Sequence, residues 1–304
     1  MKQGEHRIRT DDGVELALHR VAVAGAPRVA AAPLLLASGT FNSRSFWLGD
    51  DGQGVAWQLA RSGFDTWIME PRGHGASQRP SRWLLSDWIE RDAPAAVAAV
   101  CGVTGADGVT WVGHSAGGVV GAAFAGIDEG RSRMLRGLVL LGTPGPGTVR
   151  GRRRWLARGL HWAAAARLGG LVPGERLKLG PEMESAPLVR QWLGWNLAGS
   201  WRGPGGEDYL ACVHRVTARV LAVAGSGDDL LAPLPAVRDL LDRFRAAERT
   251  LLVAGRGEGM SRDYNHGGMV LARSAREEIW PLIERWLARP STPDAPLPEL
   301  AERP

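Results

Sequence analysis

The sequence predicts an α/β protein built on a doubly wound, mostly parallel sheet with an insertion after its sixth strand. Short, continuous apolar runs recur along the 304 residues, as expected of parallel strands that are covered on both faces. Segments with helical patterns alternate with these runs through short connections, which is typical of a doubly wound sheet. The alternation breaks over residues 145–207 and then resumes, so one sheet interrupted by an excursion is the simplest interpretation.

The first half of the chain supplies the strands that come before the excursion. Residues 6–9 and 14–20 flank an Asp-Gly turn at residues 11–13, which indicates a β-hairpin. Four buried strands follow, at residues 33–37, 64–69, 109–112 and 135–141. Helices are expected at residues 55–61, from a cap at Ser86 and Asp87 to about residue 101, and at residues 116–127.

The second half restores the same alternation. We expect strands at residues 219–224 and 250–254 and helices at residues 235–246 and 274–287. The tail at residues 290–304 holds five prolines and few large apolar groups, so we expect it to be loose. The resulting division is a core at residues 1–144 and 208–289, an insertion at residues 145–207 and a tail at residues 290–304.

The composition favours a globular protein that works without a metal or a cofactor. Hydrophobic residues make up 44% of the chain, and no apolar run approaches the roughly 18 residues that span a bilayer. Two cysteines, Cys101 and Cys212, are too few for a disulfide framework or a four-ligand zinc site. Residues 1–6 lack the apolar pattern of a signal peptide, so we expect a cytoplasmic protein.

The formal charge of +5 comes with abundant arginine, most densely placed at Arg150, Arg152, Arg153 and Arg154. Basic and aromatic residues do not interleave as they do on nucleic-acid platforms, so no nucleic-acid partner is expected. A solvated arginine face is the preferred interpretation of the cluster. Attraction to anions or to a membrane surface is the alternative.

The segment at residues 111–118, Trp-Val-Gly-His-Ser-Ala-Gly-Gly, carries the most specific chemical signal. Ser115 stands between Gly113 and Gly117, after an expected strand and before an expected helix, which is the nucleophile-elbow pattern. This turn is so sharp that side chains at either glycine would collide with their neighbours. We therefore predict that Ser115 is a nucleophile. The alternative is a glycine-rich turn whose serine merely caps a helix.

Two later strands end in residues that could activate this serine. Asp228 and Asp229 follow the strand at residues 219–224, and His266 follows the strand at residues 250–254. A serine hydroxyl needs a neutral imidazole to take its proton and a carboxylate to fix the tautomer of that imidazole. We assign His266 as general base and acid and Asp228 as the orienting carboxylate, with Asp229 as the rival for the last role.

Acyl transfer also requires two backbone amides that stabilise the oxyanion. We expect one from Ala116, directly after the nucleophile. The other should come from the loop after the strand at residues 33–37, where Thr40 is the first choice and Phe41 the second. Gly39 would let this backbone turn in close. A plain strand-ending turn is the alternative for the loop taken alone.

The other histidines show no comparable pattern. The side chain of His114 should point away from Ser115 and serve packing. His74 lies in a glycine-rich turn and should form a hydrogen bond within that turn. His19 has no evident partner in the sequence.

With these residues assigned, the chain resembles the α/β-hydrolase superfamily along nearly its whole length, and within it the lipase and esterase branch. The resemblance is carried by residues 38–47, 70–77 and 264–266 and by the elbow. Residues 54–67 and 227–232 look like the corresponding parts of acid lipases, which supports Asp228 over Asp229. These motifs are specific to the superfamily rather than to a substrate.

Two positions depart from the family pattern. Ser38-Gly39 stands where the family usually has His-Gly, and Glu70 stands where it often has Asp, so the oxyanion loop could be held differently. The resemblance implies that residues 145–207 form a helical cap over the active site. The tryptophans of this region suit either an apolar acyl or aromatic pocket or a small core of the cap itself: Trp155, Trp162, Trp192, Trp195 and Trp201.

We therefore expect a cofactor-independent serine hydrolase that cleaves a small-molecule carboxylic ester with a lipophilic acyl or alcohol part through an acyl-enzyme. A thioesterase or an acyltransferase would use the same residues. A non-catalytic ligand-binding protein of the same fold is the alternative from another class. A dehalogenase is disfavoured because that chemistry would place an aspartate where Ser115 stands.

Overall fold

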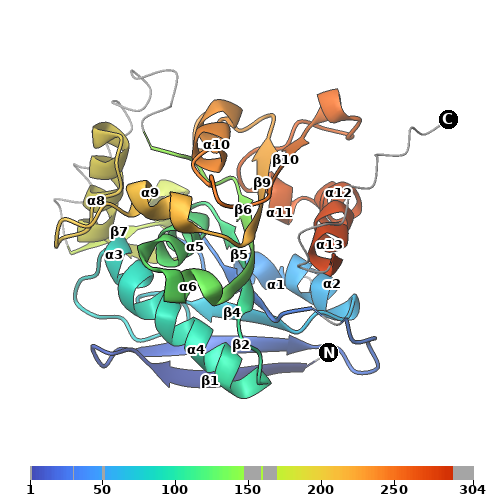
Figure 1. Ribbon diagram of the computed structural model, residues 1–304, viewed down its shortest axis with the longest axis horizontal. Coiled ribbons are helices and arrows are strands. Elements are labelled where there is room, and N and C mark those ends of the chain that lie inside the picture. Colours follow the sequence, from blue (N-terminus) through green and yellow to red (C-terminus); the bar gives the residue numbers. More distant parts are fainter. Residues whose placement is uncertain (1, 30, 50–51, 147–158, 160–169, 290–304) are drawn as a thin grey trace.

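The computed structural model describes residues 2–29, 31–49, 52–146, 159 and 170–289, and one large sheet forms its centre (Figure 1). Its strands are β1 (Lys2–Arg9), β2 (Glu15–Ala22), β3 (Leu34–Ala37), β4 (Thr66–Glu70), β5 (Val109–His114), β6 (Leu135–Leu141), β9 (Arg219–Gly225) and β10 (Arg249–Ala254). They are ordered β1-β2-β4-β3-β5-β6-β9-β10. β2 is antiparallel to both of its neighbours, and all other pairs are parallel. The expected hairpin and the mostly parallel sheet are thus confirmed.

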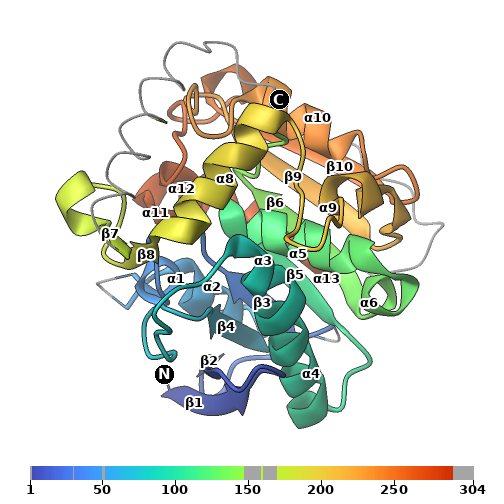
Figure 2. The same ribbon diagram turned by 90° about the vertical axis from the view of Figure 1, so that its left-hand side faces the viewer.

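Helices cover both faces of this sheet (Figures 1 and 2). One face carries α3 (Leu85–Asp87), a π-helical turn (Trp88–Asp92), α4 (Ala93–Thr104), α5 (Ala116–Ile127), α6 (Glu129–Arg133), α9 (Tyr209–Cys212) and α10 (Leu234–Leu241). The other carries α1 (Ser45–Leu48), α2 (Val55–Arg61), α11 (Gly268–Leu271), α12 (Arg273–Glu278) and α13 (Trp280–Ala288). Short 3₁₀ turns lie at Glu175–Leu177, Val213–Arg215 and Arg256–Glu258.

Successive strand residues point to opposite faces of the sheet and divide the core into two layers. In β3, Leu35 and Ala37 belong to the apolar cluster that includes α4 and α5. Leu34 and Leu36 belong to the cluster that includes α2 and α13. Because both sets are apolar, the strand appears in the sequence as a continuous hydrophobic run.

Three helices differ from the prediction, and one of them, α10, ends at Leu241 rather than near residue 246. The first helix after β4 begins at Leu85. The Asp87 side chain, in the first turn of this helix, accepts a hydrogen bond of 2.7 Å from the Leu84 amide. Asp87 thus caps the helix as predicted, but it does so from the third helical position, and Ser86 lies within the helix. The region 274–287 forms two helices, α12 and α13. Pro281 lacks the amide that a continuous helix would need.

The insertion follows β6, and its described part is not purely helical. β7 (Leu171–Pro173) pairs antiparallel with β8 (Met183–Ser185), and α8 (Ala186–Ala198) follows. Figure 2 shows α8, in yellow, near α3, with which it is in contact. The insertion thus holds a short pair of strands besides the expected helix, and three-residue strands are too short to leave an alternating pattern in the sequence.

Several sequence predictions fall outside the described residues. These concern the arginine cluster at residues 150–154, Trp155, Trp162 and the tail at residues 290–304. They stay predictions, as does the division of the chain into core and cap. Among the residues that the structure describes, no helix is both long and apolar enough to cross a membrane.

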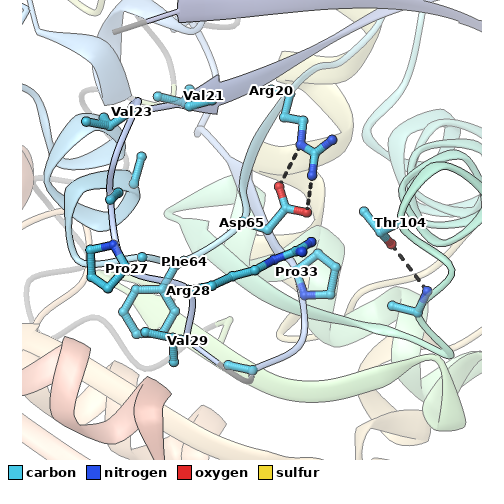
Figure 3. Close-up of a pocket in the computed structure, with 16 residues that line it drawn as sticks. Arg20, Val21, Val23, Pro27, Arg28, Val29, Pro33, Phe64, Asp65 and Thr104 are labelled. Carbon is cyan, nitrogen blue, oxygen red and sulfur yellow. Dashed lines mark hydrogen bonds and ion pairs between the residues drawn. The ribbon is translucent and has the colours of Figure 1, made fainter.

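A pocket of about 420 Å³ lies at the amino ends of the parallel strands (Figure 3). It is lined by residues that come before β3, β4 and β5, among them Pro33, Phe64 and Thr104. Arg20 is held there by Asp65 through hydrogen bonds of 2.8 and 2.7 Å. Ligand sites of open parallel sheets form at the opposite, carboxyl edge. That edge carries the predicted site residues and is the candidate for catalysis.

Candidate active site

The chain turns from β5 into α5 at Ser115, whose backbone is strained. Ser115 has φ 53° and ψ −121°, a combination that residues with a Cβ rarely adopt. A Cβ on Gly113 would lie 2.5 Å from the Gly117 carbonyl oxygen, and a Cβ on Gly117 would lie 2.7 Å from that of Ser38. Only glycine fits at these two positions, and their close packing holds Ser115 at the carboxyl edge of the sheet.

Asp228 and His266 form a hydrogen-bonded pair beyond β9 and β10. His266 Nδ1 donates to Asp228 Oδ2 at 2.6 Å, and Asp228 Oδ1 accepts the amides of Leu231 and Ala232 at 3.1 Å. Burial alone would raise the pKa of Asp228, but the hydrogen bond and charge of His266 and the two amides lower it. Asp229 is exposed and makes no hydrogen bond within the described part of the chain. The geometry therefore favours Asp228 as the partner of His266.

Ser115 and His266 line the same pocket, which has a volume of about 520 Å³. Its apolar wall is formed by Phe41, Leu177, Leu179, Trp192 and Leu231. The Ser115 hydroxyl makes no hydrogen bond to a described residue, His266 included. Such bonds often tighten only when substrate is bound. Within the same described residues, no group of three or more His, Cys, Asp or Glu side chains is placed to hold a metal ion.

The loop at residues 38–43 passes close to Ser115. A Cβ on Gly39 would lie 2.9 Å from the Cβ of Ser115, so the loop can approach this closely only with glycine there. Thr40 and Ala116 both line the pocket, and their amides donate no hydrogen bond to the described residues. The Phe41 amide instead donates to Glu184 Oε2 at 3.4 Å. Thr40 is therefore better suited than Phe41 to bind an oxyanion.

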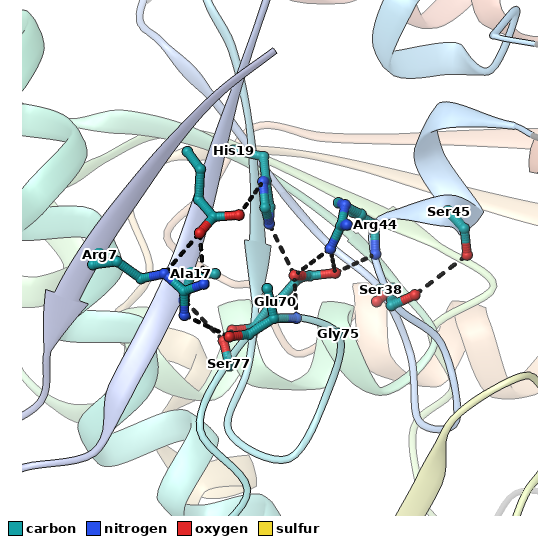
Figure 4. A network of polar contacts seen from close by, with 12 residues as sticks. Arg7, Ala17, His19, Ser38, Arg44, Ser45, Glu70, Gly75 and Ser77 are labelled. Atoms are coloured by element: carbon teal, nitrogen blue, oxygen red, sulfur yellow. Dashed lines mark hydrogen bonds and ion pairs between the residues drawn. The ribbon is translucent and has the colours of Figure 1, made fainter.

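Glu70, at the end of β4, anchors the far end of this loop (Figure 4). Its buried carboxylate accepts His19 Nε2 and the Ala76 amide at 2.8 Å, and the amide and guanidinium of Arg44 at 3.0 Å. Burial alone would raise the pKa of Glu70, but the bonds from His19, Ala76 and Arg44 outweigh it and lower the pKa to about 2. His19 thus has a partner that the sequence did not reveal.

Replacing Glu70 by glutamine should destabilise the protein at neutral pH by about 3 kcal/mol, because the pKa of about 2 lies well below the ordinary 4.5. A carboxyl whose pKa is lowered by folding contributes stability that is complete above pH 4.5 and is lost as the pH falls toward 2. The difference in unfolding free energy between wild type and variant should therefore shrink below pH 4.5. Guanidinium unfolding followed by circular dichroism at stepped pH values measures this difference.

Glu129→Gln is the matched control for this experiment. Glu129 forms an exposed ion pair with Arg133 on α6, and such pairs contribute little to stability. A loss of stability for Glu70→Gln that does not change with pH, or that is no larger than the loss for Glu129→Gln, would contradict the role assigned to Glu70.

His114 packs as expected but also contacts the proposed base. Its buried ring lies against Phe46, with 4.6 Å between the ring centroids. Its Nε2 donates to the backbone carbonyl of His266 at 2.9 Å. Burial, together with the neighbouring His266, lowers the pKa of His114 to about 3, so the ring is neutral. His114 therefore helps to fix the loop that carries His266.

The His74 amide bonds within its own turn, to the Pro71 carbonyl oxygen at 3.1 Å, but the side chain does not. Its Nε2 contacts Glu184 Oε2 at 3.1 Å, and Glu184 belongs to β8 of the insertion. Both side chains are fully buried. No sequence pattern indicates this pair, because the two residues are 110 positions apart and β8 was not expected.

Of the described tryptophans of the insertion, one lines the pocket as predicted, and two pack in the main core rather than in a separate core of the cap. Trp195 and Trp201 are buried in the main core, with ring centroids 6.5 Å apart. Trp192, on the same helix as Trp195, lines the pocket. One tryptophan of this group is therefore placed to contact a ligand, and two stabilise the packing of the insertion.

Known proteins with similar sequences and structures place this geometry in context. Residues 32–261 match the family described as alpha/beta hydrolase fold. Triacylglycerol lipase 1 of Arabidopsis thaliana is 40% identical over 70 residues, which cover 23% of this chain and 18% of that protein. A putative lysosomal acid lipase/cholesteryl ester hydrolase of Crotalus adamanteus is 29% identical over 140 residues, which cover 41% of this chain and 35% of that protein. The Pyrococcus furiosus esterase Pf2001 superimposes with a TM-score of 0.62 at 16% identity, over 94% of this chain and 90% of the esterase.

These similarities differ in what they establish. The matched segments span 18% and 35% of the two curated relatives, much less than their full length. At 16% identity, the structural likeness to the esterase concerns the fold alone. Together with the sheet order, the family match confirms the fold class that the sequence predicts.

Proposed function

Because this chain belongs to the alpha/beta hydrolase fold family, we propose that it is a serine hydrolase that cleaves carboxylic esters. One observation carries the proposal: Ser115, on its strained turn, opens into the same pocket as His266, whose Nδ1 is bonded to Asp228 at 2.6 Å. A nucleophile, a base and an orienting carboxylate from three separate strand ends are rarely brought together by packing alone. The lipase relatives support the same reaction class.

In the proposed reaction, Ser115 Oγ attacks the ester carbonyl carbon while His266 Nε2 takes the hydroxyl proton. Asp228 holds the Nδ1 proton and stabilises the imidazolium. The carbonyl oxygen becomes an oxyanion that the Thr40 and Ala116 amides stabilise, aided by the N-terminus of α5. His266 then gives its proton to the departing alcohol, which leaves the acyl group on Ser115. A water molecule that His266 deprotonates attacks this acyl-enzyme. The bond between the acyl carbon and Ser115 Oγ then breaks, His266 returns the proton to Oγ, and the acid is released.

The apolar wall of the pocket supports an ester with a lipophilic acyl or alcohol part. The wall includes Phe41, Leu177 and Trp192, which would remove a hydrocarbon chain from water. Each buried methylene contributes about 0.8 kcal/mol to binding. A thioesterase or an acyltransferase would use the same catalytic residues, but no described residue of the pocket favours a thioester or another acyl acceptor.

Activity-based labelling and a chain-length series test this proposal. The folded protein should react with a fluorophosphonate probe, whereas heat-denatured protein should not. The kcat/KM for p-nitrophenyl esters should rise about fourfold per added methylene until the pocket is filled. Folded protein that takes up no probe would rule out the serine hydrolase, and a flat profile would rule out the lipophilic pocket.

A pair of variants on α8 links this profile to the pocket. Trp192→Ala should flatten the dependence on chain length, because Trp192 lines the pocket. Leu197→Ala is the matched control, since Leu197 lies on the same helix and is 73% exposed. If the two variants show the same dependence of kcat/KM on chain length, the hydrocarbon chain of the substrate does not bind against α8.

A further inference from the structure

The insertion packs against the loop that carries the proposed oxyanion donor Thr40. The side chain of Phe41, next to Thr40, is buried in a small apolar cluster with Val172, Val189 and Leu193, all from the insertion. Phe41 also has φ 63°, a left-handed backbone that is unusual for an aromatic residue. The insertion thus supplies the buried apolar residues that cluster with this side chain.

The backbone of Phe41 is held by the segment between β7 and β8. Its carbonyl oxygen accepts the Glu182 amide at 3.0 Å. A Cβ on Gly180 would lie 2.9 Å from the Phe41 carbonyl carbon, and a Cβ on Gly174 would lie 2.8 Å from its ring. Glycines at these two positions therefore let the segment close tightly around Phe41.

Glu184 of the insertion also binds this loop, through its buried carboxylate. It accepts Trp83 Nε1 at 2.8 Å, His74 Nε2 at 3.1 Å and the Phe41 amide at 3.4 Å. The Glu184 side chain is fully buried, as is that of His74. Although burial alone would lower the pKa of His74, the charge of Glu184 raises it. The Glu184 carboxylate therefore connects the insertion to the oxyanion loop and to the core by hydrogen bonds.

From these contacts we propose that Glu184 is a positioning residue for the oxyanion hole, and that the hole is complete only while the segment at residues 171–185 is docked on Phe41. This inference rests on the proposed ester hydrolysis. Gly39 is fixed against Ser115, and Phe41 is fixed in the insertion, so Thr40 is the single residue between two anchors. Loss of the outer anchor would let the Thr40 amide turn away from the developing oxyanion.

The experiment compares Glu184→Ala and Glu184→Gln with the matched control Glu175→Gln. Glu175 lies on the same segment, but it is exposed and its side chain makes no hydrogen bond or ion pair with a described residue. The readouts are kcat, KM and inhibition by a trifluoromethyl ketone, which forms a tetrahedral oxyanion adduct with the nucleophilic serine. Thermal unfolding verifies that each variant is folded at the assay temperature.

We expect Glu184→Ala to lower kcat by about 10- to 100-fold, less than the loss of a whole oxyanion donor, with KM changed by no more than about twofold. Affinity for the trifluoromethyl ketone should fall by the same factor as kcat. Glu184→Gln should show a smaller loss in the same direction, because its amide oxygen can still accept from Phe41, and Glu175→Gln should match the wild type.

Several results would overturn the inference. One is a folded Glu184→Ala with the kcat and ketone affinity of the wild type, and another is a loss confined to KM. If the alanine variant does not fold, the same criteria apply to Glu184→Gln. Probe labelling and turnover of the wild type, measured first, test the proposed function separately. An active wild type with unaffected variants refutes only the role of Glu184.

Discussion

Replacing Ser115 by alanine should lower kcat for ester hydrolysis by about 10⁴-fold or more and abolish labelling by a fluorophosphonate probe. The change removes the atom that would form the acyl-enzyme, while the pocket and the His266–Asp228 pair stay in place. Steady-state turnover and probe labelling measure the loss, and circular dichroism verifies the fold. A folded Ser115→Ala that retains wild-type turnover would show that another residue carries the reaction.

Ser115→Gly is the informative companion of this variant. Both variants lack the hydroxyl, but only alanine keeps a Cβ on a backbone with φ 53° and ψ −121°. Strain of this kind costs roughly 1–3 kcal/mol, of which the greater flexibility of glycine in the unfolded chain offsets up to about 1 kcal/mol. Ser115→Gly should therefore unfold at a higher denaturant concentration than Ser115→Ala. The opposite order would mean that the elbow is not strained.

The central strands were predictable because their physical cause is local. A strand that is buried on both faces must be apolar at every position, and β3 and residues 138–141 of β6 show this directly in the sequence. The nucleophile elbow could be predicted from the sequence for a related reason. Gly113 and Gly117 are required by collisions within a few residues of Ser115 and with the adjacent strand.

The contacts that hold the oxyanion loop could not be predicted in the same way. Glu70 and Glu184 each gather partners from distant parts of the chain, and no periodic pattern joins such residues. The sequence did indicate that the loop departs from its family at Ser38-Gly39 and at Glu70. It could not show that a carboxylate of the insertion takes part, because β8 has only three residues.

The two anchors act on opposite ends of one loop. Glu70 fixes Arg44 against the sheet, and Glu184 fixes Phe41 against the insertion. Loss of Glu70 is expected to affect mainly stability, since its carboxylate joins several core segments through short hydrogen bonds. Loss of Glu184 is expected to affect mainly the oxyanion hole. Comparing the two variants would separate the stability of the fold from the geometry of the site.

The second large effect is expected at Asp228. Asp228→Asn should lower kcat by about 10³- to 10⁴-fold, because an amide nitrogen facing His266 cannot accept its Nδ1 proton and favours the wrong tautomer. The variant should still fold, since the asparagine oxygen can keep the hydrogen bonds from Leu231 and Ala232. Turnover of a p-nitrophenyl ester and thermal unfolding measure the two expectations.

Asp229→Asn is the matched control, because the two aspartates are adjacent and both changes remove one charge from the same loop. Asp229 is exposed and makes no hydrogen bond within the described residues, so its variant should keep kcat within about twofold of the wild type. Equal losses at the two positions would indicate that the charge of the loop matters rather than a bond to His266. A large loss at Asp229 alone would reassign the orienting carboxylate. The expected asymmetry follows from one hydrogen bond of 2.6 Å, which makes it a direct test of the proposed triad.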